Sequence, residues 1–143
     1  MDDQSKNVTE FLELLQDLQN KSLEKLHLAF LKRGALGIKS YISLSRRPCH
    51  YGSEEFSGVI SVGLLVRVVQ TEELEFDTSV WWNQKEWLIK TEAARYSDEK
   101  DGMDVIRELP IQRTNKLTDC IKTIQSDMLE LSKWSDLADI GPS

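Results

Sequence analysis

The segment from Leu74 to Tyr96 constrains the fold most, because its alternation and its turn agree on one strand pairing. Apolar and polar side chains alternate along both arms, which is the pattern of half-buried strands. If residues 83–86 form the connection, one face of the pair carries Trp82 opposite Trp87, Val80 opposite Ile89, Thr78 opposite Thr91, and Phe76 opposite Ala93. A single register therefore places every favourable cross-strand pair on the core side.

The flanking patterns predict one α+β domain over residues 1–143, in which helices enclose a run of strands. The expected elements are a helix at about 8–33, strands at about 38–45, 58–69, 74–82 and 87–96, a helix at about 115–134, and a fraying tail at 135–143. The strands form a four-stranded antiparallel meander, or a five-stranded one if Val105–Leu109 adds a strand. Both helices are expected on one sheet face.

Several local features refine this outline. A capping box at Asn7–Glu10 marks the expected start of the first helix, and Asn20–Ser22 either interrupts that helix or is contained in it. Residues 46–53 and 97–104 are expected as loops. Side-chain parity requires an odd number of residues between the second and third strands, so we expect about three or five loop residues and no two-residue turn.

Charge and composition exclude some classes of binding partner. The net charge of −6 argues against a nucleic-acid partner. The charge is unevenly distributed, with seven basic residues against one acid in residues 21–47, and eleven acids against five basic residues in residues 72–108. We expect no membrane partner, since no apolar run reaches spanning length. The N-terminus lacks the pattern of a secretory signal, and the two cysteines suit a reducing compartment, so a cytoplasmic location is expected.

Two pairs of residues are weak candidates for catalysis. Cys49 and His50 are the residue types of a nucleophile and its base, but neighbours in an extended chain point apart. Asp77 and Glu92 face each other on the side of the sheet away from the core, where close carboxylates raise one another's pKa and could divide acid and base roles. No glycine-rich phosphate loop and no metal-ligand spacing occurs, so no cofactor and no metal are expected.

The same outer side carries an apolar group that suggests a binding face. Its members are Trp81, Leu88, Leu65, Val59 and Val69. An apolar group rimmed by charge is typical of a partner site, of a homodimer contact, or of a surface hidden under a loop of the same chain. A second candidate binding element is the basic loop, whose residues are Arg46, Arg47, His50 and Tyr51.

These observations favour a small, acidic protein-binding module, an adaptor or a toxin-neutralising partner, over an enzyme. The partner is expected to be another protein or a second copy, bound through the outer sheet face. The alternative is a hydrolase or lyase that uses Asp77 and Glu92, or Cys49 and His50.

Overall fold

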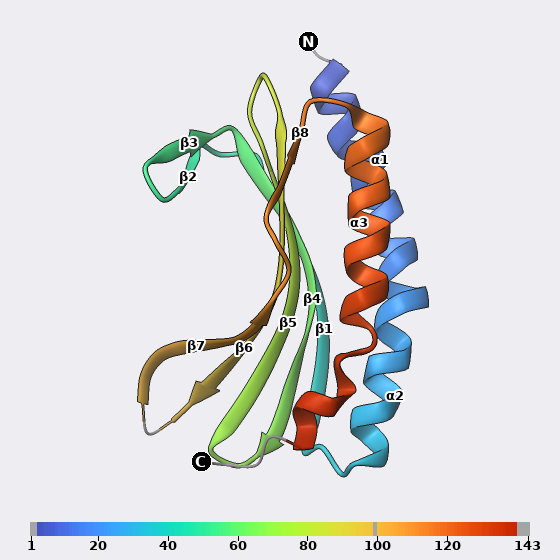
Figure 1. The fold of residues 1–143 in the computed structure, drawn as a ribbon, viewed down its shortest axis with the longest axis vertical. Helices are drawn as coiled ribbons and strands as arrows, with labels where there is room; N and C mark the ends of the chain where they lie inside the picture. The colour runs from blue at the N-terminus through green and yellow to red at the C-terminus, as the bar shows by residue number, and fades with distance from the viewer. Residues whose placement is uncertain (1–2, 99, 140–143) are drawn as a thin grey trace.

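The fold, seen in a computed structural model that describes residues 3–98 and 100–139, combines an antiparallel sheet with helices at both ends (Figure 1). The helices are α1 (Asp3–Leu18), the π-helix η1 (Gln19–Leu23), α2 (Glu24–Lys32), α3 (Leu117–Leu131) and the 3₁₀-helix η2 (Trp134–Asp139). The strands are β1 (Gly37–Ser45), β2 (Cys49–Tyr51), β3 (Glu54–Phe56), β4 (Gly58–Val69), β5 (Glu72–Trp82), β6 (Trp87–Ser97), β7 (Lys100–Glu108) and β8 (Gln112–Thr114). The α+β class is confirmed.

The expected number of strands, four or five, is too low. Within the described residues a six-stranded sheet has the order β1-β4-β5-β6-β7, and β8 pairs with β6 beyond the end of β7. Strands β2 and β3 form a separate two-stranded sheet inserted between β1 and β4. Residues 100–104, expected in a loop, belong to β7, whose acidic and polar sequence hides its strand character. The range Val105–Leu109 falls mostly within the same strand.

The register predicted for β5 and β6 is confirmed. Trp82 pairs with Trp87, and Asp77 lies opposite Glu92. The turn between the strands is closed by Asn83, whose side-chain Oδ1 accepts hydrogen bonds from the backbone N–H groups of Lys85 and Glu86 at 2.8 and 2.9 Å. An asparagine that binds the backbone two and three residues ahead stabilises such a turn.

The connection between β4 and β5 differs from the expected one. It is a two-residue turn at 70–71, which the parity argument had excluded. A register irregularity between Arg67 and Val69 adds one residue to β4, so that Arg67 still pairs with Glu73 and the apolar faces stay aligned. Parity is therefore preserved by a β-bulge instead of by a longer loop.

The described helices lie against one face of the sheet (Figure 1). They bury an apolar stripe against the alternating strand residues, which creates a continuous core. One polar chain crosses this core, where Thr78 and Thr91 share a hydrogen bond of 3.0 Å and Thr91 donates to Asp127 Oδ2 at 2.9 Å. Core members include Phe11, Leu15, Leu26, Phe30, Ile60, Val62, Leu64, Phe76, Val80, Ile89, Ile124 and Met128.

The helical segments also differ in detail from the sequence expectation. The first begins at Asp3, so the predicted capping residue Asn7 lies inside it. Residues 19–23 neither break the helix nor continue it regularly, because they form a π-helical turn between α1 and α2. Part of the tail predicted to fray is ordered in η2, with Leu137 only 1% exposed, while residues 140–143 lie outside the described part. None of the described helices has the length and apolar character needed to span a membrane.

Candidate functional site

The sheet face away from the helices, here called the outer face, is framed at both ends. The β2–β3 hairpin stands off this face near one end of the strands, and strand β7 curls toward the same side at the other end (Figure 1). Between them lie the polar side chains that alternate with the core residues along β4, β5 and β6. Polar and charged side chains can therefore cluster on the outer face.

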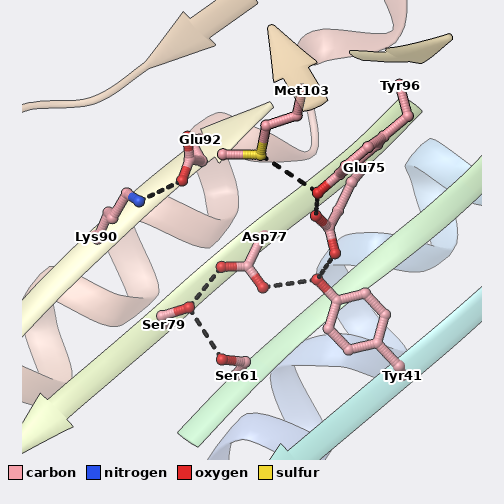
Figure 2. Close-up of polar contacts among 9 residues, drawn as sticks. All are labelled: Tyr41, Ser61, Glu75, Asp77, Ser79, Lys90, Glu92, Tyr96 and Met103. Carbon is pink, nitrogen blue, oxygen red and sulfur yellow. Dashed lines mark hydrogen bonds and ion pairs between the residues drawn. The ribbon is translucent and has the colours of Figure 1, made fainter. Parts of the chain in front are cut away.

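Three acids gather on this face, and we call Glu75, Asp77 and Glu92 the carboxylate cluster (Figure 2). Strand alternation places Glu75 and Asp77 on the same face of β5, and the register sets Glu92 of β6 opposite Asp77. The pairing of Asp77 with Glu92 predicted from the sequence is therefore present. Glu92 is 7% exposed, which is unusual for an acid on the side of a sheet without helices.

Tyr41 reaches the cluster from two strands away. It pairs with Gly63 of β4, and its ring lies across that glycine so that its hydroxyl lies 2.6 Å from Asp77 Oδ1 and 2.9 Å from Glu75 Oε2. A Cβ atom at Gly63 would overlap both the Phe76 carbonyl oxygen and the Tyr41 hydroxyl. The missing side chain at Gly63 is what allows β1 to contribute to the site.

The other partners of Glu75 and Asp77 are also neutral hydroxyl groups. Ser79 Oγ donates to Asp77 Oδ2 at 2.5 Å and lies 3.0 Å from Ser61 Oγ, while the Tyr96 hydroxyl donates to Glu75 Oε1 at 2.9 Å (Figure 2). Among the residues that the structure describes, no lysine or arginine lies within ion-pair distance of Glu75 or Asp77. The two acids are solvated by hydroxyls and are not neutralised by a salt bridge.

The pKa values reflect this lack of a counter-ion. Burial raises the pKa of Asp77 to about 6, the hydrogen bonds from Ser79 and Tyr41 lower it in part, and the charges of Glu75 and Glu92 raise it again. Burial and the neighbouring Glu75 also raise the pKa of Tyr96 to about 12. Burial and the Asp77 charge raise the pKa of Tyr41 well above its ordinary value. Both phenols therefore stay protonated and act as donors.

Glu92 has a different environment from the other two acids. Its Oε1 lies 2.5 Å from Lys90 Nζ, and its Oε2 is buried with no hydrogen-bond partner among the described residues. Burial lowers the pKa of Lys90, but the Glu92 carboxylate outweighs it and the net shift is upward. Lys90 Nζ also lies 5.3 Å from the centre of the Tyr51 ring. Lys90 is thus paired with Glu92, and the charge of Asp77 adds to the upward shift of its pKa.

The predicted apolar binding group is only partly exposed to solvent. Leu88 is 0% exposed, and Trp81 is half-buried under the β2–β3 hairpin, with ring centroids 5.5 Å from Tyr51 and 5.9 Å from Phe56. The other three members, Val59, Leu65 and Val69, are half-buried as well. Trp81 is covered by Tyr51 and Phe56 of this hairpin, whose first strand lies within residues 46–53, a range expected as a loop.

That hairpin also settles the positions of Cys49, His50 and the basic loop. Cys49 and His50 are neighbours in β2 and so point to opposite sides, and His50 Nε2 lies 3.6 Å from Glu55 Oε2. Burial raises the pKa of the Cys49 thiol, the opposite of what an activated nucleophile needs. Arg46 and Arg47 are exposed before β2, whereas Tyr51 packs on Trp81. The structure does not assemble these residues into one site.

A groove of about 1120 Å³ lies between the β2–β3 hairpin, the β5–β6 turn and β8. At its wall, Arg113 binds both Glu54, through two contacts at 2.6 and 3.0 Å, and Glu86. Arg113 holds the pKa of Glu54 below its usual range. Because these charges satisfy one another, the groove offers less uncompensated charge than the carboxylate cluster does.

Sequence reasoning identified Asp77 and Glu92 but missed Tyr41 and Tyr96. One signal was present, since Gly63 interrupts an apolar strand, and a glycine inside a strand marks a close approach of another group. In the described part of the chain, no three His, Cys, Asp or Glu side chains are arranged to hold a metal ion. Comparison of the chain with protein-family models, with curated proteins and with solved structures finds no match.

Proposed function

We propose that this protein is a protein-binding module, of the adaptor or toxin-neutralising type, whose outer face receives a basic side chain of its partner. One observation carries the proposal: Glu75 and Asp77 are brought together on the outer face, and their hydrogen-bond partners among the described residues are hydroxyl groups. A partly buried anionic pair without a counter-ion favours any cation that can reach it. A guanidinium or ammonium group of a partner supplies that cation.

The surroundings of the pair suit an arginine better than a lysine. A guanidinium presents several N–H donors in a plane, so it can bind two adjacent carboxylates at once. The rings of Tyr41 and Tyr96, whose hydroxyls meet at Glu75, add flat aromatic surface on which a guanidinium stacks. The net charge of −6 assists by steering a basic partner toward the protein during diffusion.

A defined probe tests the proposal, namely a labelled oligo-arginine peptide, with a glutamine peptide of equal length as the uncharged comparison. We expect Glu75→Gln/Asp77→Asn to weaken binding of the arginine peptide at least about tenfold. The matched control is Glu10→Gln/Asp119→Asn, which removes the same charge from two exposed helix positions. Equal losses in both double variants would show attraction to net charge alone and would overturn the proposal.

The pH dependence of the same binding provides a second readout. Asp77, with a pKa of about 6, is protonated below that pH and ionised above it. Affinity for the arginine peptide should therefore rise as pH increases through about 6, and this rise should disappear in Asp77→Asn. A wild-type affinity that is flat over this range would count against Asp77 as part of the binding site.

Hydrolase or lyase chemistry at Asp77 and Glu92 is the second candidate. It is supported by the pKa of Asp77 near 6, which suits a general acid or base. Both Asp77 oxygens are already engaged by Tyr41 and Ser79, so chemistry would require one of these hydrogen bonds to open. Turnover of a chromogenic ester or glycoside that vanishes in Asp77→Asn would favour this candidate over the binding module.

A further inference from the structure

Strand β1 forms one edge of the sheet, and the backbone groups that it directs away from β4 can be identified. Gln19 Nε2 donates to the Tyr41 carbonyl oxygen at 2.7 Å, so the backbone of Tyr41 points away from β4. In an antiparallel strand both backbone groups of a residue face the same edge, and successive residues alternate. By this alternation Lys39 and Ser43 also direct their N–H and C=O groups away from β4, while Ser40 and Ile42 direct theirs toward it. Between Lys39 and Ser43, the Tyr41 carbonyl oxygen is already bound to Gln19, so an added strand would use the groups on either side of it.

A cavity of about 390 Å³ lies in the angle between this edge and the helices. It is lined by Gln19 and Asn20 of η1, Glu24 and His27 of α2, and Ser40 of β1, with Leu23 and Leu64 at its base. The π-helical turn contributes residues to this wall, and such turns recur at functional sites in proteins. A strand added beside β1 would direct alternate side chains into the cavity, whose polar lining suits a hydroxyl or amide group.

The charge along this edge indicates what kind of strand could bind. Residues 21–47, which include α2 and β1, carry seven basic residues against one acid. Of the seven, Lys25 and Lys32 of α2 and Lys39 of β1 are exposed. The other four are Lys21, which pairs with Asp17, Arg33, which binds the Ser135 carbonyl oxygen, and Arg46 and Arg47, which follow the end of β1. A second copy paired through β1 would bring these cations together, whereas an acidic segment would neutralise them.

We propose that β1 is a docking edge for an extended acidic segment of another protein, which adds as a strand and places one small polar side chain in the cavity. Main-chain hydrogen bonds to Lys39 and Ser43 supply affinity, and the cavity and the lysines supply selectivity. This site adjoins the carboxylate cluster, because Tyr41 lies between Lys39 and Ser43 on β1 and its hydroxyl contacts Asp77 and Glu75. It differs from the cluster in using the opposite charge and the backbone groups at the edge of the sheet.

The probe is a labelled peptide of alternating threonine and glutamate, about as long as β1. Its binding to the full chain is followed by fluorescence anisotropy, and the amide protons of residues 37–45 are followed by NMR hydrogen exchange. We expect binding together with slower exchange at Lys39 and Ser43. Absence of binding at millimolar peptide, or changes confined to the carboxylate cluster, would overturn the proposal.

Two variants test the mechanism. Ser43→Pro removes one outward N–H, which an edge strand tolerates, and should weaken binding roughly tenfold, whereas Ser43→Ala keeps the N–H and should bind as wild type does. Should Ser43→Pro fail to fold, Ser40→Phe fills the cavity without altering the backbone donors and should reduce affinity by a similar factor. Unchanged affinity in Ser40→Phe would remove the cavity from the proposal. Exchange at Lys39 that slows with rising protein concentration, without peptide, would assign the edge to a second copy and contradict it.

Discussion

Asp77 shows how a single residue couples the outer face to stability. Its pKa of about 6 lies above the ordinary value of 3.8, so between these values the folded state binds more protons than the unfolded state. Stability therefore falls as pH rises through this window, and the loss is complete above about 6. The shift corresponds to at most about 3 kcal/mol, reduced because Asp77 is partly exposed.

We therefore expect Asp77→Asn to be more stable relative to wild type at neutral pH than at acidic pH. The measurement is the free energy of unfolding by urea for both proteins between about pH 4 and about pH 8. Comparing the two proteins at each pH cancels the titration of other groups. Parallel curves with a constant difference would mean that Asp77 carries no excess proton in the folded state.

At the scale of the elements, Gly63 joins β1 to β5 by letting the Tyr41 ring pass over β4. A methyl group there would overlap the Phe76 carbonyl oxygen, which cannot move without disturbing the sheet. We expect Gly63→Ala to lower the free energy of unfolding by roughly 1–3 kcal/mol and to separate Tyr41 from Asp77.

The control for Gly63→Ala is Gly37→Ala in β1, where the nearest atom to an added Cβ is 3.9 Å away. That variant should stay within about 0.5 kcal/mol of wild type. The pKa of Asp77, followed by NMR, should also change in Gly63→Ala and stay constant in Gly37→Ala. A Gly63→Ala protein as stable as the control would show that Tyr41 does not depend on the glycine.

The strands around Gly63 also show which features could be predicted from the sequence and which could not. The pairing of Asp77 with Glu92 follows from alternation and one turn, both of which are local. The arrival of Tyr41 depends on the register of two further strand pairs, which no local pattern records. The β2–β3 hairpin was missed because Pro48 and Gly52 punctuate strands of only three residues. The β-bulge near Arg67 leaves no composition signal, although parity required an extra residue.

At the scale of the whole molecule, the β2–β3 hairpin changes the expectation about assembly. A homodimer contact was one of three interpretations of the apolar group around Trp81 and Leu88, beside a separate partner and a cover supplied by a loop of the same chain. Tyr51 and Phe56 pack on Trp81 from within the chain, and Arg113 ties the hairpin to the sheet through Glu54. The cover over Trp81 therefore does not require a second copy.

We expect the protein to be monomeric at micromolar concentration by light scattering, with Trp81 protected from acrylamide. Trp82, Trp87 and Trp134 are at most 8% exposed, so the emission of Trp81 is obtained as the difference between wild type and Trp81→Phe. Tyr51→Ala should increase quenching of this difference signal without changing the mass. A dimer in which Trp81 becomes accessible on dilution would show that a second copy provides the cover.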